Sequence, residues 1–286
     1  MMSIFLSVVF ATLLFVILKL FQKFNIHLLQ GLVFNYATAA TLGFLMFPEK
    51  IDWLKTFQSD WFIFSFCLGF LFIGIFYAVA ITTQKKGLST ASVASKMSVV
   101  IPILSGLFFF KEKIVWQGMI GLVLALIAIY LTSKKDQQAS NAGYNSYPLI
   151  VFFGAGTIDA LLKIIQTNYL QNDETPLFAA FTFGFAFCIG MFLVLKEVVF
   201  EKQKIEGKNI LAGVLLGIPN YCSLYFMIAM LKDAYFDSAI IFAVHNIAIV
   251  LFSTLIGLIF FKNKLTKINL LGVFAALLAM VFLVFN

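Results

Sequence analysis

Four ionisable side chains lie inside stretches of the sequence that are otherwise apolar: Lys96, Asp159, Lys163 and His245. On insertion scales, a charged group at the centre of a membrane helix costs about 2.5–3.5 kcal/mol, so such residues usually face the protein interior or a water-filled cavity. There they commonly line the path of a substrate or an ion. Their presence predicts a binding site for a polar or charged solute within a membrane.

Lys96 is the most isolated of these charges. It lies in the segment ASVASKMSVVIP, at residues 91–102, and no acidic residue is near it in the sequence. Ser92 precedes it by four residues and Ser89 by seven, so the three side chains share one face of a helix. A serine-lined face with a cation suits a cavity wall and predicts that Lys96 attracts a carboxylate or phosphate of the solute. The alternative is that the long lysine side chain extends to the nearer membrane interface.

Asp159 precedes Lys163 by four residues, so these two side chains also share a helical face. One interpretation is a self-neutralising pair that lowers the cost of inserting both charges. The other is a coupling pair that a proton or the substrate disrupts. The two interpretations are compatible, and both are left open here.

Other apolar runs supply further polar candidates. His245 and Asn246 are neighbours in the ninth run, where we expect them to orient the solute; a hydrogen-bonded core histidine is the alternative. Additional substrate-binding candidates are Asn35, Tyr77, Asn220 and Tyr221. Pro102 and Pro219 lack the backbone N–H that a helix interior uses, so they predict hinges in their helices.

The composition places these residues in a membrane protein. Of the 286 residues, 62% are hydrophobic and only 12% are charged, and the mean hydropathy is +1.01. A water-soluble domain of this size needs a more polar surface. The 20 basic residues are all lysines, and most lie in short connections, where they meet lipid headgroups. The net charge of +7 therefore does not indicate nucleic-acid binding.

Apolar runs of about twenty residues recur along the sequence, and each is long enough to cross a hydrocarbon core of roughly 30 Å as a helix. We predict an all-α polytopic membrane protein with a single membrane domain over residues 1–286. Its ten transmembrane helices are expected at residues 3–20, 28–47, 61–82, 89–110, 115–132, 148–170, 176–195, 209–230, 236–261 and 267–285.

The sequence divides into two similar halves, residues 1–134 and 147–286, with a polar linker at 135–146. The segment FFKEKIVWQGMIG, at 109–121, matches FFKNKLTKINLLG, at 260–272, without a gap. Because each half has an odd number of spans, the second half crosses the membrane in the opposite sense. The sequence thus predicts two inverted five-helix repeats, an arrangement typical of secondary transporters.

The first half closes with SVVIPILSGLFFFKEKIVWQGMIGLVLALIAIYLTS, at residues 98–133. This passage includes Pro102, Gly106, Glu112 and Gly121. Together with the organisation as five plus five spans, it makes the whole chain resemble the EamA-type branch of the drug/metabolite transporter (DMT) superfamily. The second half departs from the pattern, with Asn263 at the Glu112 position and Ser253 at the Pro102 position. The resemblance implies a substrate carrier and leaves its cargo open.

We therefore expect a secondary transporter, not an enzyme, that moves a small polar metabolite of anionic or zwitterionic character by alternating access. We expect it in the cell inner (plasma) membrane. The repeat aligns His245 and Asn246 with residues next to Lys96, which favours a shared substrate site. The expected partners are the small-molecule substrate and the lipid bilayer, without nucleic acid; proton or exchange coupling and the oligomeric state are left open.

Two alternatives come from other classes: a membrane-embedded enzyme and a passive channel. The sequence has no nucleotide-binding loop, no common hydrolase or metalloprotease motif and no Cys/His metal cluster. We therefore predict no catalytic residue, no metal site and no cofactor. Repeat symmetry favours transport over catalysis, and saturable flux with trans-stimulation would distinguish a carrier from a channel.

Two arguments about orientation disagree. The family resemblance implies that residues 1 and 286 are cytoplasmic, which leaves five lysines in cytoplasmic connections: Lys50, Lys55, Lys111, Lys113 and Lys232. The connections on the other side, here termed the lysine-rich side, carry thirteen: Lys19, Lys23, Lys85, Lys86, Lys134, Lys135, Lys196, Lys202, Lys204, Lys208, Lys262, Lys264 and Lys267. The positive-inside rule favours the reverse orientation, with this side in the cytoplasm.

Overall fold

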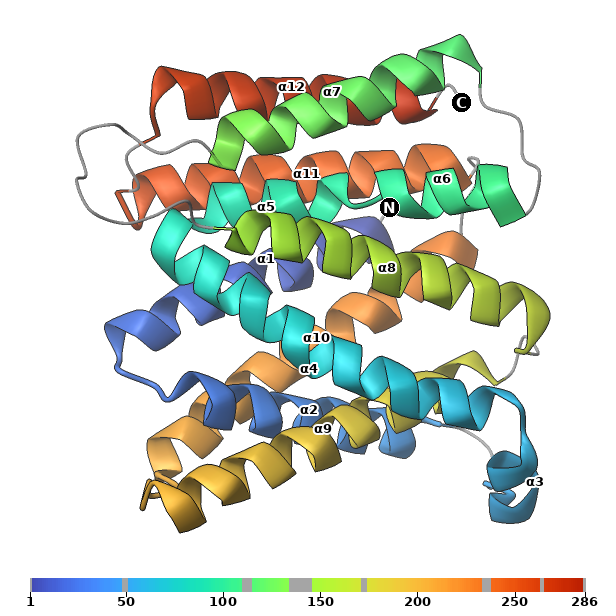
Figure 1. The fold of residues 1–286 in the computed structure, drawn as a ribbon, viewed down its shortest axis with the longest axis vertical. Coiled ribbons are helices and arrows are strands. Elements are labelled where there is room, and N and C mark those ends of the chain that lie inside the picture. Colours follow the sequence, from blue (N-terminus) through green and yellow to red (C-terminus); the bar gives the residue numbers. More distant parts are fainter. Residues whose placement is uncertain are drawn as a thin grey trace. The chain divides into compact units, whose positions relative to one another are not determined.

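The structure is a computed structural model that describes residues 2–47, 51–109, 115–133, 146–170, 174–232, 238–262 and 265–284. All regular secondary structure in these ranges is helical (Figure 1). The helices are α1 Met2–Lys23, α2 Leu28–Met46, α3 Trp53–Gln58, α4 Trp61–Lys86, α5 Leu88–Met97, α6 Val100–Phe109, α7 Trp116–Ser133, α8 Tyr147–Asn168, α9 Thr175–Phe200, α10 Gly207–Lys232, α11 Ser238–Ile259 and α12 Lys267–Val284.

The helices confirm the expected all-α, multi-pass membrane protein. Within the described residues, five helices have the length and apolar composition needed to cross a membrane: α1, α2, α4, α9 and the Gly207–Met227 part of α10. Shorter apolar helical stretches lie in α5–α6, α7, α8, α11 and α12. Length and composition do not test the number of membrane crossings or their inverted arrangement, so both stay predictions.

The structure differs from the expected spans at residues 89–110, where two helices replace one. Helix α5 ends at Met97 and α6 begins at Val100. Pro102 has no N–H to donate to the carbonyl of Ser98, four residues earlier. Instead, the N–H of Ile101 donates a hydrogen bond to the Ser98 carbonyl at 2.9 Å. This bond spans three residues and closes a tighter turn than an α-helix makes. At the other end of α5, Gly87 has φ 93°, a conformation that glycine adopts without strain, and it separates α4 from α5.

The chain forms two compact units, each containing segments from both sequence halves. Unit 1 comprises Met1–Lys19, Ala78–Ala160 and Ser223–Asn286, and unit 2 comprises Leu20–Tyr77 and Leu161–Cys222. The boundaries fall inside α1, α4, α8 and α10. The predicted linker and the ends of the predicted repeats lie partly outside the described residues.

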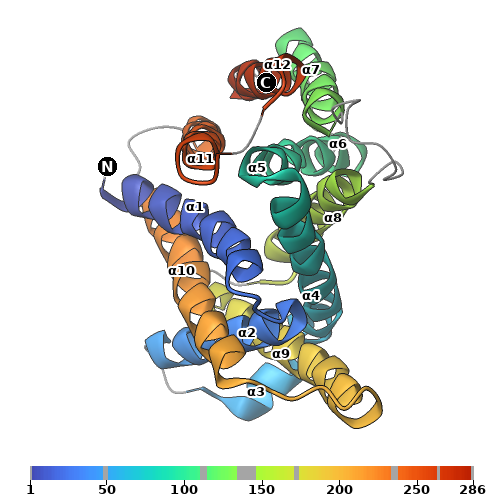
Figure 2. The ribbon, with the colours of Figure 1, turned by 90° about the vertical axis from the view of Figure 1, so that its left-hand side faces the viewer.

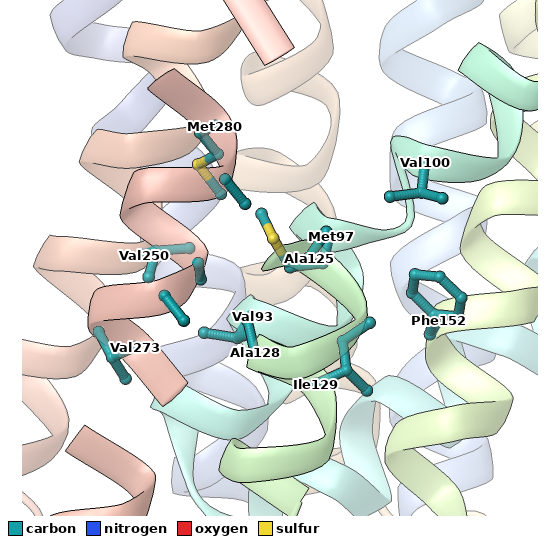
Figure 3. Packing of buried hydrophobic residues seen from close by; sticks show 13 residues of the cluster. Val93, Met97, Val100, Ala125, Ala128, Ile129, Phe152, Val250, Val273 and Met280 are labelled. Carbon is teal, nitrogen blue, oxygen red and sulfur yellow. The ribbon is translucent and has the colours of Figure 1, made fainter. Parts of the chain in front are cut away.

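The core of unit 1 surrounds α5, as Figure 3 shows. Val93 and Met97 of α5 are fully buried and belong to one cluster with residues of α7, α8, α11 and α12. On α7 the cluster contains Ala125 and Ala128, whose small side chains allow close packing of helices. The apolar face of α5 is thus fixed between neighbouring helices, and this fixes where its polar face points.

Helices α7 and α12 lie against each other with almost no space between their backbones (Figures 1 and 2). A Cβ atom added to Gly121 would lie 2.8 Å from Cγ of Leu283, and one added to Gly272 would lie 2.7 Å from Cγ2 of Thr132. The gapless match that pairs Gly121 with Gly272 also pairs Thr132 with Leu283. The two close contacts therefore join equivalent positions of the two halves.

Unit 2 is organised around the packing of α2 against α9. A Cβ atom added to Gly43 would lie 2.9 Å from Cβ of Ala180, and one added to Gly190 would lie 2.6 Å from Cγ2 of Val33. These two contacts hold α2 close to α9. Trp61, which is 1% exposed, extends this core through ring contacts with residues of α9.

We predict that Gly272→Ala destabilises the protein. The added methyl group would also lie 2.8 Å from the backbone nitrogen of Thr132, which cannot rotate away, so α7 and α12 must separate. Overpacking of this kind costs about 1–3 kcal/mol. The apparent melting temperature of the detergent-purified protein should fall by several degrees. Gly74→Ala is the matched control, because no atom lies within 4 Å of its added Cβ; equal melting temperatures for the two variants would contradict the prediction.

Candidate functional site

The polar residues of unit 1 gather where α5 is interrupted. Lys96 lies in the last turn of α5, and Ser98 caps that end of the helix. The last carbonyl groups of a helix lack intrahelical partners and carry partial negative charge, so a cation is favourable there. The interruption of α5 thus stabilises the lysine charge that the apolar sequence around it does not.

Asp159 of α8 supplies the opposite charge. The side chains of Lys96 and Asp159, both of which the structure describes, interact electrostatically. They do not form a direct ion pair. By side-chain surface area, Asp159 is exposed and Lys96 is half-buried. The predicted pair of Asp159 with Lys163 is not tested, since the Lys163 side chain lies outside the described residues. Among the described side chains, the charge near Asp159 is that of Lys96.

Ser98 connects the helix interruption to this charge. Its hydroxyl group donates a hydrogen bond to the Ser95 carbonyl at 2.5 Å, and it is also within reach of the Asp159 carboxylate. A hydroxyl group has one proton to donate. The Ser98 hydroxyl can therefore donate its proton either to the Ser95 carbonyl at the end of α5 or to the Asp159 carboxylate, but not to both at once.

His245 of α11 is held by Ser7 of α1. Its Nε2 atom lies 2.9 Å from Oγ of Ser7, and the Ser7 hydroxyl donates to the Ser223 carbonyl at 3.1 Å. If that donation uses the serine proton, Nε2–H of the histidine donates to Ser7 and Nδ1 is left as an acceptor. His245 is only 3% exposed and its Nδ1 atom has no hydrogen-bond partner, while Lys96 is near enough for electrostatic interaction. The site thus combines a cation, a carboxylate and an unused acceptor.

Hydroxyl groups join α5 to α11 beside this site. Ser253 donates to Ser92 at 2.6 Å, and Thr254 donates to Ser89 at 3.0 Å. Ser92 is fully buried and also donates to the Ser89 carbonyl at 3.0 Å. The structure therefore places Ser92 in a contact between helices, and its expected role as a direct substrate contact stays a prediction.

The remaining candidates are divided between the two units. Asn246 is half-buried next to His245 in unit 1. In unit 2, Asn220 donates to Oδ1 of Asn35 at 3.0 Å, and Nδ2 of the buried Asn35 has no hydrogen-bond partner. Tyr221 is half-buried in unit 2 and Tyr77, at its boundary, is 40% exposed.

Of the two predicted hinges, Pro102 follows the break between α5 and α6, whereas α10 continues as a helix through the buried Pro219. In the part of the chain that the structure describes, no group of three or more His, Cys, Asp or Glu side chains could hold a metal ion.

Comparison with known proteins identifies the family of this chain. The model of the EamA-like transporter family matches residues 1–134. A protein of Haemophilus influenzae, named only as uncharacterized, is 30% identical over 274 residues, covering 92% of this chain and 91% of the relative. The chain belongs to the EamA-like transporter family.

Two further similarities say less about this chain. A protein of Staphylococcus epidermidis named as a ribose uptake protein, RbsU, is 31% identical to the EamA-like chain over 90 residues, or 30% of this chain and 28% of that protein. A solved crystal structure superposes with a TM-score of 0.58 at 17% identity, covering 98% of this chain and 96% of the other. This second similarity shows a shared fold alone. Members of the EamA-like family are transporters, which agrees with the expectation of a non-enzyme.

Sequence reasoning missed two partners in this EamA-like transporter. Ser7, which fixes the His245 ring, lies in the first apolar run; Ser3 precedes it by four residues, but that spacing indicates no partner on another helix. The approach of Asp159 to Lys96 joins different helices and has no local spacing signal. The Lys163 spacing, four residues from Asp159, was the stronger pattern in the sequence.

We predict that Lys96 and Asp159 are energetically coupled. Asp159→Asn removes the carboxylate that partly balances Lys96, so it should destabilise the transporter more than the same change in a Lys96→Met background. Interacting residues show coupling of about 0.5–3 kcal/mol. Thermal unfolding of the two single variants and the double variant in one detergent measures the coupling. Strictly additive shifts in melting temperature would contradict it.

Proposed function

We propose that this EamA-like transporter is a secondary carrier that moves a small polar metabolite, anionic or zwitterionic, by alternating access. The observation that supports the proposal best is the position of Lys96 and Asp159 in unit 1. These two opposite charges, both on described residues, interact next to the break between α5 and α6 but do not form a direct ion pair. We propose the cell plasma membrane as its location.

A zwitterion fits these charges better than any neutral solute. Two opposite charges that serve structure alone gain most by direct contact, which repays part of their desolvation. Held apart, each can instead bind a group of the substrate: Lys96 a carboxylate and Asp159 an ammonium group. The acceptor Nδ1 of His245 adds a place for a donor of the substrate. An anion without an ammonium group would use Lys96 alone.

The inverted repeat and alternating access are part of the proposal. The paired contacts described above support the repeat, because Gly121 with Leu283 and Gly272 with Thr132 involve equivalent positions. Inverted repeats of this kind commonly place a substrate site near the bilayer midplane and move around it. The Ser98–Val99 interruption is the proposed flexible point nearest to that site.

A neutral sugar is the second candidate, favoured by different observations. The partial similarity to the protein named as a ribose uptake protein points to this class. In unit 2, the Asn35–Asn220 pair offers carboxamide groups, and one buried Nδ2 atom lacks a partner. Carboxamide and hydroxyl groups can exchange hydrogen bonds without any charge.

Counterflow in proteoliposomes tests the proposal. Vesicles loaded with a zwitterionic amino acid, with its des-amino carboxylate or with ribose should show which class exchanges with labelled solute. We expect exchange of the zwitterion, and we expect Lys96→Met to reduce it at least tenfold because the carboxylate loses its counter-charge. Lys55→Met is the control, since it removes an exposed lysine of α3. Unimpaired exchange in Lys96→Met would refute the role of Lys96, and exchange of ribose alone would favour the sugar.

A further inference from the structure

The hydroxyl group of Ser7, in unit 1, lies between two groups to which it can bind. Its oxygen is 3.1 Å from the carbonyl oxygen of Ser223 and 2.9 Å from Nε2 of His245. A hydroxyl group has one proton to donate and can accept at the same time. If it donates to the Ser223 carbonyl and accepts from Nε2–H, both contacts are hydrogen bonds. If it donates to Nε2, only one of them is.

The two arrangements also differ at the other nitrogen of the His245 ring. With the ring proton on Nε2, Nδ1 is an acceptor without a partner, and with the proton on Nδ1 it is a buried donor without a partner. Buried N–H groups that lack a partner are rare in proteins. The positive charge of Lys96, which interacts with the ring, further favours a lone pair on the atom that has no partner. We therefore take Nδ1 as an unprotonated acceptor.

This acceptor is unused within the described part of the chain. The carboxamide group of Asn246 interacts with the His245 ring, yet Nδ1 has no hydrogen-bond partner among the described residues. His245 is only 3% exposed, so bulk water is not a ready substitute. A buried polar atom without a partner costs free energy, which a bound ligand with a suitable donor would recover.

Lys96 limits which donor would reach Nδ1. Its charge interacts with both Asp159 and His245, so two acceptors, a carboxylate and an imidazole nitrogen, lie around one cation. A substrate carboxylate bound to Lys96 would bring its neighbouring atoms close to both acceptors. In an α-amino acid the ammonium group is attached to the carbon next to the carboxylate, and it carries three N–H donors. Asp159 can balance its charge while His245 accepts one of its N–H groups.

We propose that Nδ1 of His245 accepts a hydrogen bond from the ammonium group of the substrate, so that the carrier selects amino acids over their N-trimethyl derivatives. Ser7 is the positioning residue that keeps the ring proton on Nε2. This selectivity rests on the proposed function, because it concerns a zwitterion held at Lys96 and Asp159. Charge alone would not produce it, since methylated and unmethylated ammonium groups carry the same charge.

Competition between methylated and unmethylated substrates tests the selectivity. Proteoliposomes are loaded with amino acids that have uncharged side chains, and they then take up an equal mixture of the same amino acids and their N-trimethyl derivatives, read by mass spectrometry. The native chain should prefer the unmethylated form by about tenfold or more, because a site built to bind a donor rejects an analogue that lacks it. Equal uptake of both forms would overturn this proposal and leave the carrier standing. Uptake of neither would overturn the proposed function as well.

Two substitutions of His245 separate hydrogen bonding from steric exclusion of the methyl groups. The carboxamide oxygen of an asparagine can take the place of Nδ1, whereas the longer glutamine places its carboxamide group near the position of Nε2. His245→Asn should therefore keep most of the preference for the unmethylated form, and His245→Gln should lose most of it. An equal preference in these two variants would contradict the role of Nδ1.

The role of Ser7 has a readout that does not depend on transport. The sequence has two histidines, so His27→Asn, which keeps a side chain that can cap α2, leaves His245 as the one imidazole. In the ¹⁵N-histidine-labelled full chain, NMR should show an unprotonated Nδ1 that shifts when the amino acids are added and not when their N-trimethyl derivatives are. Ser7→Ala should populate both tautomers, and Ser7→Thr should restore the native signal because it keeps the hydroxyl group. A protonated Nδ1 beside native Ser7, or an Nδ1 signal that the amino acids leave unchanged, would overturn the proposal.

Discussion

The energetic cost of an ionised group in an apolar helix is the constraint on which the candidate site depends. Lys96 is tolerated because several features reduce that cost together. Helix α5 ends one residue after it, so the unpaired carbonyl groups of a helix end are close. Asp159 adds an opposing charge.

Holding such a site requires neighbouring helices that do not separate. Apolar contact alone drives helix association weakly in lipid, since lipid tails are equally apolar. In unit 1, small residues bring α7 and α12 together, and hydroxyl pairs tie α5 to α11. The buried residues around Val93 and Met97 then fix the rotation of α5. The polar face of α5, with Lys96, is oriented by packing on its other face.

The sequence predicts the class of fold well because its strongest signals are local. Apolar runs locate the membrane helices, and the isolated charge of Lys96 marks the site without any partner being known. The signal fails where partners come from different helices. The spacing of Asp159 and Lys163 is visible in the sequence and stays a prediction, whereas the approach of Asp159 to Lys96 depends on how α5 and α8 pack. Ser7 and the exact place of the helix break were likewise set by tertiary contacts and by the carbonyl that Pro102 leaves free.

The single proton of Ser98 has a thermodynamic consequence. The Ser98 hydroxyl donates to the Ser95 carbonyl and lies near Asp159, so under the proposed function a ligand bound to Asp159 would leave the proton to the end of α5. Linkage requires the effect to be reciprocal, so any movement that changes the end of α5 must change ligand affinity by the same factor. Affinity for the cargo and the geometry of the interrupted helix are then two measures of one coupling free energy.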